Sequence, residues 1–193
     1  MNGNALVRIF LIIVAIALLA GNAMCQSFKW DQSTALKRPE DQLVNSIAAR
    51  LLLSREVAWS KFCSHAVVRD LAREAKVLTD LKAEGRKLGL TPEQVTYFFK
   101  PQIIASCRLQ EELIGGWAVG AIARPTTPPK DLPGEIRPLL DKVDQTLLLQ
   151  WKAVYAKPFD QADYYAAKGA IEEQGFSSEV AGIAARPMGG STR

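Results

Sequence analysis

The sequence predicts an all-α protein, a bundle of about six helices, from two observations. After residue 38, apolar residues recur three and four positions apart over most of the chain, the period of a helix with one buried face. No stretch alternates apolar and polar residues over the length of a half-buried strand. With 193 residues, 48% of them apolar, the chain is long enough for one domain with a real core.

The first 25 residues are expected to lie outside this fold. Arg8 is their only charge, and residues 9–21 form an apolar run of 13 residues, short of the roughly 20 that span a bilayer. Small residues follow, which is typical of a secretory signal peptide cleaved after Ala23 or after Cys25. A lipid-modified Cys25 and an uncleaved anchor are the alternatives. Residues 26–193 would then form a single periplasmic or secreted domain with no stable membrane span.

The first predicted helix spans residues 39–64. Pro39 is followed by two acidic residues, which favours a helix start with negative charge in the first turn. Leu43, Ile47 and Leu51 then fall four apart on one face. The sequence HAVV, residues 65–68, is the expected turn into a second helix.

The second helix is expected to begin at Asp70 and to end near Gly89, because glycine suits the left-handed position after a helix. A third helix, residues 91–117, has the clearest start: Thr91 as N-cap, a proline at N1, and Gln94 to complete a capping box. Pro101 lies inside this helix and has no amide hydrogen to donate. We therefore expect a kink or a local break at that point.

The C-terminal half predicts a loop followed by three helices. Residues 123–134 hold four prolines and are typical of a long loop. A fourth helix is expected over residues 138–155, and two shorter ones over residues 160–173 and 177–185. The tail, residues 186–193, is expected to be disordered.

Charge and cysteine content narrow the classes of function. The net charge of +4 falls to about +3 without Arg8, and no basic stripe with interleaved aromatic residues occurs, so nucleic acid is not an expected partner. One histidine and the cysteines Cys63 and Cys107 offer no metal-ligand spacing, so no metal site is expected. After export the two cysteines can pair only if their Cα atoms lie within roughly 7 Å, which leaves a disulfide open.

Three predicted helices each carry a short polar stripe. Positions three, four or eleven apart lie on one helix face, which groups Arg50 with Lys61, Asp70 with Arg73 and Glu74, and Ser106 with Gln110. Each stripe taken alone fits a solvent-exposed surface. However, Arg50, Ser106 and Gln110 have mainly apolar neighbours, and buried polar groups need partners. These stripes are therefore expected to face one another or a ligand.

The segments that carry these stripes resemble a known family. RLLLSREVAWSK, KFCSHAVVRDLARE and FFKPQIIASCRLQ are similar to the all-helical, AroQ-type chorismate mutases, over about residues 43–117. The export signal and the additional helices after residue 119 resemble the secreted or periplasmic gamma subgroup. The resemblance implies one AroQ-type domain with catalytic helices at about 39–118 and a C-terminal helical part at about 133–186.

The resemblance also implies an isomerase of the shikimate pathway, in aromatic amino acid biosynthesis. Chorismate mutases convert chorismate to prephenate by a unimolecular [3,3] rearrangement without a cofactor. Chorismate carries two carboxylates, which suit the planar fork of arginine. Its breaking C–O bond leaves negative charge on the ether oxygen, where a donor stabilises the transition state more than the ground state.

Roles follow from the resemblance position by position. Arg50 and Arg73 resemble the arginines that bind carboxylates, and Lys61 and Gln110 resemble the pair that donates to the ether oxygen. The remaining carried-over positions are Glu74, which resembles the carboxylate that holds the ring hydroxyl, Asp70 beside it, and Ser106, which resembles the hydroxyl that touches a carboxylate. Some secreted relatives have glutamate in place of Gln110, which must be protonated to donate, whereas an amide donates at any pH.

This sequence differs from the intracellular dimeric members of the family at one position. In those members the partner chain supplies a further arginine to the site. The corresponding position here is Ser33. The secreted subgroup takes this arginine from after the third helix, where Arg137 is the best candidate and Arg124 the alternative. A kink at Pro101 would rotate Ser106 and Gln110 relative to the first helix.

Two other readings compete with an exported chorismate mutase. An exported helical binding module would hold a small dicarboxylate through the arginines without reaction. A purely structural helical protein would keep its polar stripes in solvent. A homodimer is compatible with each of them, because dimers are the commonest homo-oligomers.

Overall fold

The computed structural model describes residues 38–190, and within them it contains six α-helices and no strand. The all-α prediction is therefore confirmed. The helices are α2 (Pro39–Ser64), α3 (Leu71–Lys87), α4 (Pro92–Ala118), α5 (Arg137–Val154), α6 (Gln161–Glu172) and α7 (Ser178–Ala185), with a π-helical turn at Leu132–Ile136 and a 3-10 turn at Arg186–Met188. The predicted signal peptide and Ser33 lie outside the described residues.

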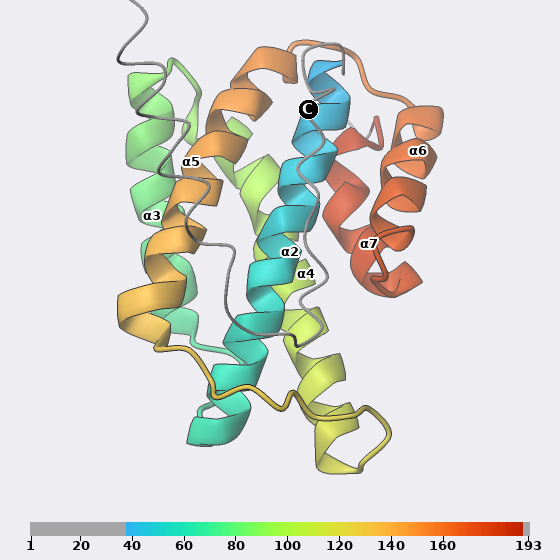
Figure 1. The fold of residues 1–193 in the computed structure, drawn as a ribbon. Helices are drawn as coiled ribbons and strands as arrows, with labels where there is room; N and C mark the ends of the chain where they lie inside the picture. The colour runs from blue at the N-terminus through green and yellow to red at the C-terminus, as the bar shows by residue number, and fades with distance from the viewer. Residues whose placement is uncertain (1–37, 191–193) are drawn as a thin grey trace, which may run out of the picture. The chain divides into compact units, whose positions relative to one another are not determined.

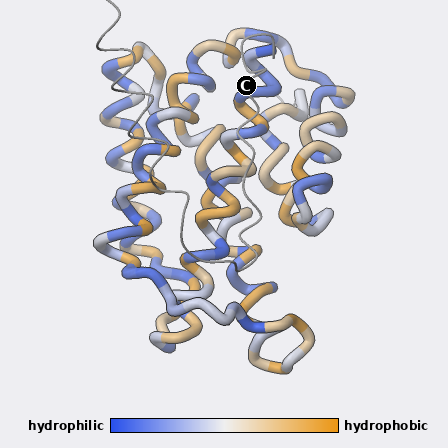
Figure 2. The backbone as a smooth tube through the Cα atoms, viewed as in Figure 1, coloured by the Kyte–Doolittle hydropathy of each residue, from blue (hydrophilic) through white to orange (hydrophobic). Residues whose placement is uncertain are grey.

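Helix α2 lies at the centre of the bundle, between α4 and α5 (Figure 1). Helix α3 packs against α4 and α5, and α6 and α7 form a pair that contacts α2 and α4. Hydrophobic and hydrophilic residues recur along each helix in Figure 2, as expected for helices with one buried face. This arrangement brings the polar stripes of α2, α3 and α4 into one part of the bundle.

The predicted helix boundaries agree closely with the structure, because local capping sets them. The hydroxyl of Thr91 accepts from the Gln94 amide at 3.2 Å, and the Gln94 side chain accepts from the Thr91 amide at 2.8 Å. The carboxylate of Asp70 accepts from the Arg73 amide at 3.0 Å, so Asp70 is the N-cap of α3. Gly89 has a φ of 78°, the left-handed conformation expected after a helix.

One local prediction is wrong, and of the kink or break expected at Pro101 the break does not occur. The tail is not disordered over residues 186–190, because Pro187 and Met188 are buried and Met188 joins the hydrophobic core. No break occurs at Pro101, since α4 runs without interruption from Pro92 to Ala118. Burial of the neighbouring Phe98, Phe99 and Gln102 holds this helix in place although the proline donates no hydrogen bond.

Trp151 of α5 is the centre of the aromatic core. Its ring stacks on Phe98 with 4.9 Å between centroids, and its indole N–H donates to the carbonyl of Gln94 at 3.2 Å. A second group, Trp59, Phe62 and Trp117, packs where α2 and α4 end. These contacts fix α5 and the ends of α2 and α4, the elements that carry the polar stripes.

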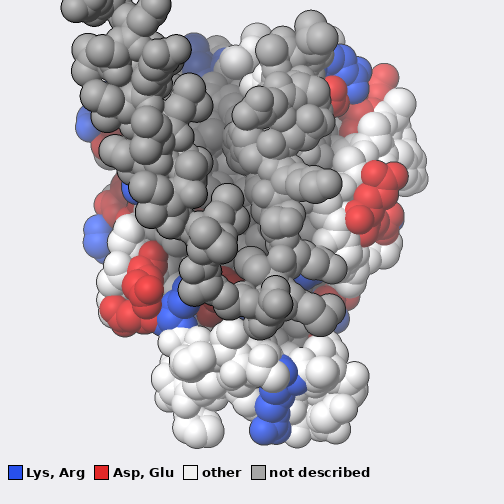
Figure 3. Space-filling model, in the orientation of Figure 1, with Lys and Arg blue, Asp and Glu red and all other residues white. Residues whose placement is uncertain are grey.

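Within residues 38–190, Cys63 and Cys107 are both free, the first exposed and the second buried. None of the helices in residues 38–190 is long and apolar enough to cross a bilayer. On the face drawn in Figure 3, Lys and Arg are interspersed with Asp and Glu over the described surface.

Helices α3 and α4 approach closely at Gly85, and this contact generates a stability prediction. A Cβ at Gly85 would lie 2.5 Å from Cγ2 of Val95, a side chain with little rotamer freedom in a helix. We expect Gly85→Ala to lower the free energy of unfolding by roughly 1–3 kcal/mol, despite the better helix propensity of alanine. Urea denaturation measures the change.

Gly115 is the matched control, because a Cβ there meets nothing within 4 Å. Gly115→Ala should raise the free energy of unfolding by about 0.5–1 kcal/mol. Equal effects of the two substitutions would show that α3 and α4 are not in close contact at Gly85.

Candidate active site

The polar stripes of α2, α3 and α4 line one cavity of about 220 Å³, which α5 closes. Every site residue predicted from the sequence is part of its lining: Arg50, Lys61, Asp70, Arg73, Glu74, Ser106, Gln110 and Arg137. They come from α2, the start of α3, α4 and the start of α5. The structure thus brings the predicted residues together, while the role of each stays a prediction.

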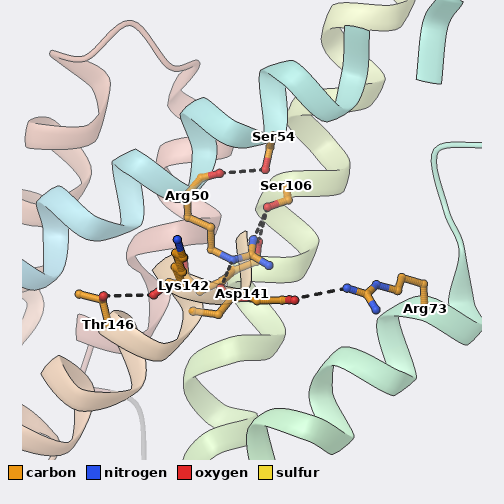
Figure 4. Close-up of polar contacts among 9 residues, drawn as sticks. Arg50, Ser54, Arg73, Ser106, Asp141, Lys142 and Thr146 are labelled. Carbon is orange, nitrogen blue, oxygen red and sulfur yellow. Dashed lines mark hydrogen bonds and ion pairs between the residues drawn. The ribbon is translucent and has the colours of Figure 1, made fainter. Parts of the chain in front are cut away.

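Arg50 is the most constrained of these side chains, with only 6% of the residue exposed. Its Nε donates to Oδ1 of Asp144 at 2.6 Å, and its Nη1 donates to the carbonyl of Gln102 at 3.1 Å and to the hydroxyl of Ser106 (Figure 4). Ser106 in turn donates to the same Gln102 carbonyl at 3.0 Å. The Nη2 group makes no hydrogen bond to another described residue.

Lys61 lies on the last turn of α2, where His65 ends the helix in the left-handed conformation. Its ammonium donates to the carbonyl of Val68 at 2.6 Å, across the turn between α2 and α3. Burial lowers the pKa of Lys61, with a smaller contribution from Arg137, against the opposing influence of nearby acidic groups. The ammonium is therefore a partly desolvated donor at the cavity wall.

Gln110 is only 5% exposed, and its Oε1 has no hydrogen-bond partner among the described residues. An unpaired buried polar group costs about 1–3 kcal/mol, which is unusual outside functional sites. A ligand in the cavity would find this amide already desolvated.

The acidic residues at the start of α3 have different roles in the structure. Asp70 caps the helix through the Arg73 amide, and the Arg73 guanidinium lies 3.7 Å from Asp141. Glu74 accepts from Arg69 at 3.1 and 3.4 Å, and the Cys107 thiol lies 3.7 Å from its Oε1. Burial raises the pKa of Cys107, so this thiol is a neutral neighbour of Glu74.

The two candidate arginines after the third helix lie in different places. Arg137, at the first position of α5, lines the cavity. Arg124 donates to the Trp117 carbonyl at 3.0 and 3.1 Å, packs over the Phe62 ring, and is not part of the cavity lining. The geometry therefore favours Arg137 as the additional cation.

Asp141 and Asp144 line the cavity and were not predicted. A signal for them exists in the sequence, because Arg137, Asp141 and Asp144 are four and seven positions apart on one face of α5. Asp144 also precedes the buried Leu148 and Trp151 by four and seven positions, which marks it as a charge on the core side.

Comparison with known proteins agrees with this geometry. Residues 35–112 match the family model described as chorismate mutase type II. This stretch of the chain is therefore similar to a chorismate mutase type II domain. The solved chorismate mutase from Burkholderia phymatum is 28% identical with a TM-score of 0.70, covering 78% of this chain and 98% of that one. The chorismate mutase from Burkholderia thailandensis is 27% identical with a TM-score of 0.67, covering 78% and 97%.

These neighbours confirm the AroQ-type fold of a family of isomerases. The chorismate mutase type II match covers α2, α3 and most of α4, which supply seven of the eight predicted site residues. Arg137 and the unpredicted Asp141 and Asp144 lie on α5, beyond the matched stretch. Helix α5 is therefore the part of the site that the family model does not describe.

The buried pair of Arg50 and Asp144 generates the second prediction. Asp144→Ala leaves the Arg50 charge buried without its carboxylate, and should lower the free energy of unfolding by about 3–5 kcal/mol in urea denaturation. The matched control is Asp80→Ala, which breaks an exposed helical pair of similar length, 2.8 Å to Lys76. That change should cost less than about 1 kcal/mol. Similar small losses in both variants would contradict a buried ion pair.

Proposed function

We propose that this chain is an exported chorismate mutase, which converts chorismate to prephenate by a [3,3] rearrangement. The observation that carries the proposal is the convergence of Arg50, Lys61, Arg73, Arg137 and the Gln110 amide on one cavity. Seven of the eight predicted site residues lie at positions that resemble the family and come from segments far apart in the sequence. The fold brings them to the same cavity. Solvent-exposed stripes on a structural protein would not converge in this way.

The cations fit a substrate with two carboxylates. Arg50 lines the cavity, its side chain is already fixed by Asp144, Gln102 and Ser106, and its Nη2 has no hydrogen bond to a described residue. Arg73 is held only weakly by Asp141, at 3.7 Å, and can turn to a ligand carboxylate. Fixed charges bind the folded, reactive conformer of the substrate with little further ordering.

The donors fit the charge that develops in the rearrangement. As the C–O bond breaks, negative charge grows on the ether oxygen, and the Lys61 ammonium and the Gln110 amide are the donors assigned to it. Both are desolvated before the substrate arrives, so their hydrogen bonds are strong in the transition state. A millionfold acceleration needs about 8 kcal/mol, which several charge-assisted hydrogen bonds can supply together.

Export is part of the proposal and rests on residues 1–25, an apolar run with one charge followed by small residues. The intact mass of the protein recovered outside the cytoplasm distinguishes cleavage after Ala23 from cleavage after Cys25. A mass that retains these residues would contradict a cleaved signal.

The activity is tested by following the loss of chorismate with purified protein. Wild type should turn over chorismate, and Lys61→Ala should lose about a hundredfold or more in kcat/KM because it removes a transition-state donor. Arg137→Ala should also lose activity, whereas the matched Arg124→Ala, whose side chain lies outside the cavity, should retain it.

Calorimetric binding of chorismate without product formation would instead indicate the binding module. Equal turnover by wild type and Lys61→Ala would remove the proposed mechanism.

The lowered pKa of Lys61 generates a pH prediction with opposite signs for activity and stability. Only the ammonium is an effective donor, so kcat/KM should fall as pH rises through a pKa below the ordinary lysine value of 10.5. Between the folded and unfolded pKa values the unfolded chain binds more protons, so the free energy of unfolding rises with pH in that window.

Lys61→Met isolates the effect on stability, because it removes the titrating group and keeps the apolar stem. The difference in unfolding free energy between wild type and Lys61→Met should depend on pH in this alkaline window and be constant below it. A flat difference, or an activity limb at or above 10.5, would contradict the lowered pKa.

A further inference from the structure

A second cavity, of about 770 Å³, lies between α4, the start of α6 and the turn that follows α7. Its lining residues are Thr96, Tyr97, Lys100, Pro101, Ile104, Gln161, Tyr164, Arg186, Pro187 and Gly189. It shares no lining residue with the candidate active site. Its chemistry can therefore be considered separately from the rearrangement.

The charge around this cavity is uncompensated. Lys100 and Arg186 line it, no carboxylate does, and neither cation forms an ion pair with another described residue. The active-site cavity and two smaller cavities of the described chain contain at least one carboxylate each, among them Glu74, Asp163 and Glu93. Two exposed cations facing a shared concave surface without an anion favour an anionic ligand.

The walls between the two cations are aromatic and apolar. Tyr97 of α4 reaches the carbonyl of Pro187 at 3.5 Å, and thereby links α4 to the turn after α7. Tyr164 of α6, together with Pro101 and Ile104, completes the surface. Flat rings and aliphatic groups suit a planar apolar body, while Gln161 at the start of α6 adds an amide.

We propose that this second cavity binds a small anion with a planar apolar body, an aromatic carboxylate being the simplest example. The carboxylate pairs with Lys100 and Arg186, and the ring packs against Tyr97 and Tyr164. The inference does not depend on chorismate mutase activity, because it uses none of the active-site residues.

Benzoate and benzamide are a matched pair of probes, nearly equal in shape and different in charge. The purified protein is titrated with each while backbone amide NMR signals are followed. Benzoate should give saturable shifts at Lys100, Ile104 and Tyr164, and benzamide should bind at least about fivefold more weakly because it lacks the charge. Acetate, which lacks the ring, should also bind at least about fivefold more weakly.

Variants locate the site. Lys100→Ala and Arg186→Ala each remove an exposed cation and should raise the dissociation constant for benzoate at least about fivefold. Lys142→Ala, an exposed cation on α5 that does not line the cavity, should leave it unchanged. Signals of Arg73 and Glu74 report any benzoate in the active site and are fitted separately.

Three results would overturn the proposal: no saturable shift around Lys100, equal binding of benzoate and benzamide, or an unchanged dissociation constant in both cavity variants. Well-dispersed spectra of the variants show that they remain folded. If the wild type did not turn over chorismate, this binding test would be unaffected. The two proposals can therefore fail independently.

Discussion

The ion pair and hydrogen bonds of the buried Arg50 guanidinium are the interactions on which the rest of the structure depends. It starts on α2, pairs with Asp144 of α5 and donates to the Gln102 carbonyl of α4. The Gln102 side chain donates in turn to the Ala184 carbonyl of α7 at 2.9 Å, so one chain of contacts joins four helices. A cation in this position is costly to desolvate, and the fold is consistent only if each of these partners is in place.

This constraint explains why the cavity is ready for a ligand before one arrives. Arg50 cannot swing away, because three partners hold two of its three nitrogen atoms. Lys61 is likewise partly desolvated and the Gln110 amide is buried with an unpaired Oε1, at a cost in stability that a ligand would offset. Such preorganisation is the main source of electrostatic catalysis, since the dipoles need no rearrangement when charge develops.

The sequence was sufficient where the information is local. Capping at Thr91, the N-cap Asp70 and the left-handed Gly89 are set by neighbours within a few positions, and the predicted boundaries followed them. Asp144 was missed because its partner lies 94 residues away, and only tertiary packing joins them. The tail was mispredicted for the same reason: chain ends are often disordered, whereas burial of Met188 in the core fixes this one up to residue 190.

The candidate active-site cavity is lined by as many cations as carboxylates, so a bound dianion would leave excess negative charge unless a carboxylate of the lining moves away. The cations are Arg50, Lys61, Arg73 and Arg137, and the carboxylates are Asp70, Glu74, Asp141 and Asp144. Asp144 is buried and stays with Arg50, so a ligand carboxylate adds a contact at the free Nη2. Asp141 has a side chain that is 60% exposed, so it can return to solvent when a ligand takes Arg73. Arg50 therefore keeps Asp144 and adds the ligand, whereas Arg73 exchanges Asp141 for the ligand. Helix α5 supplies both of these carboxylates.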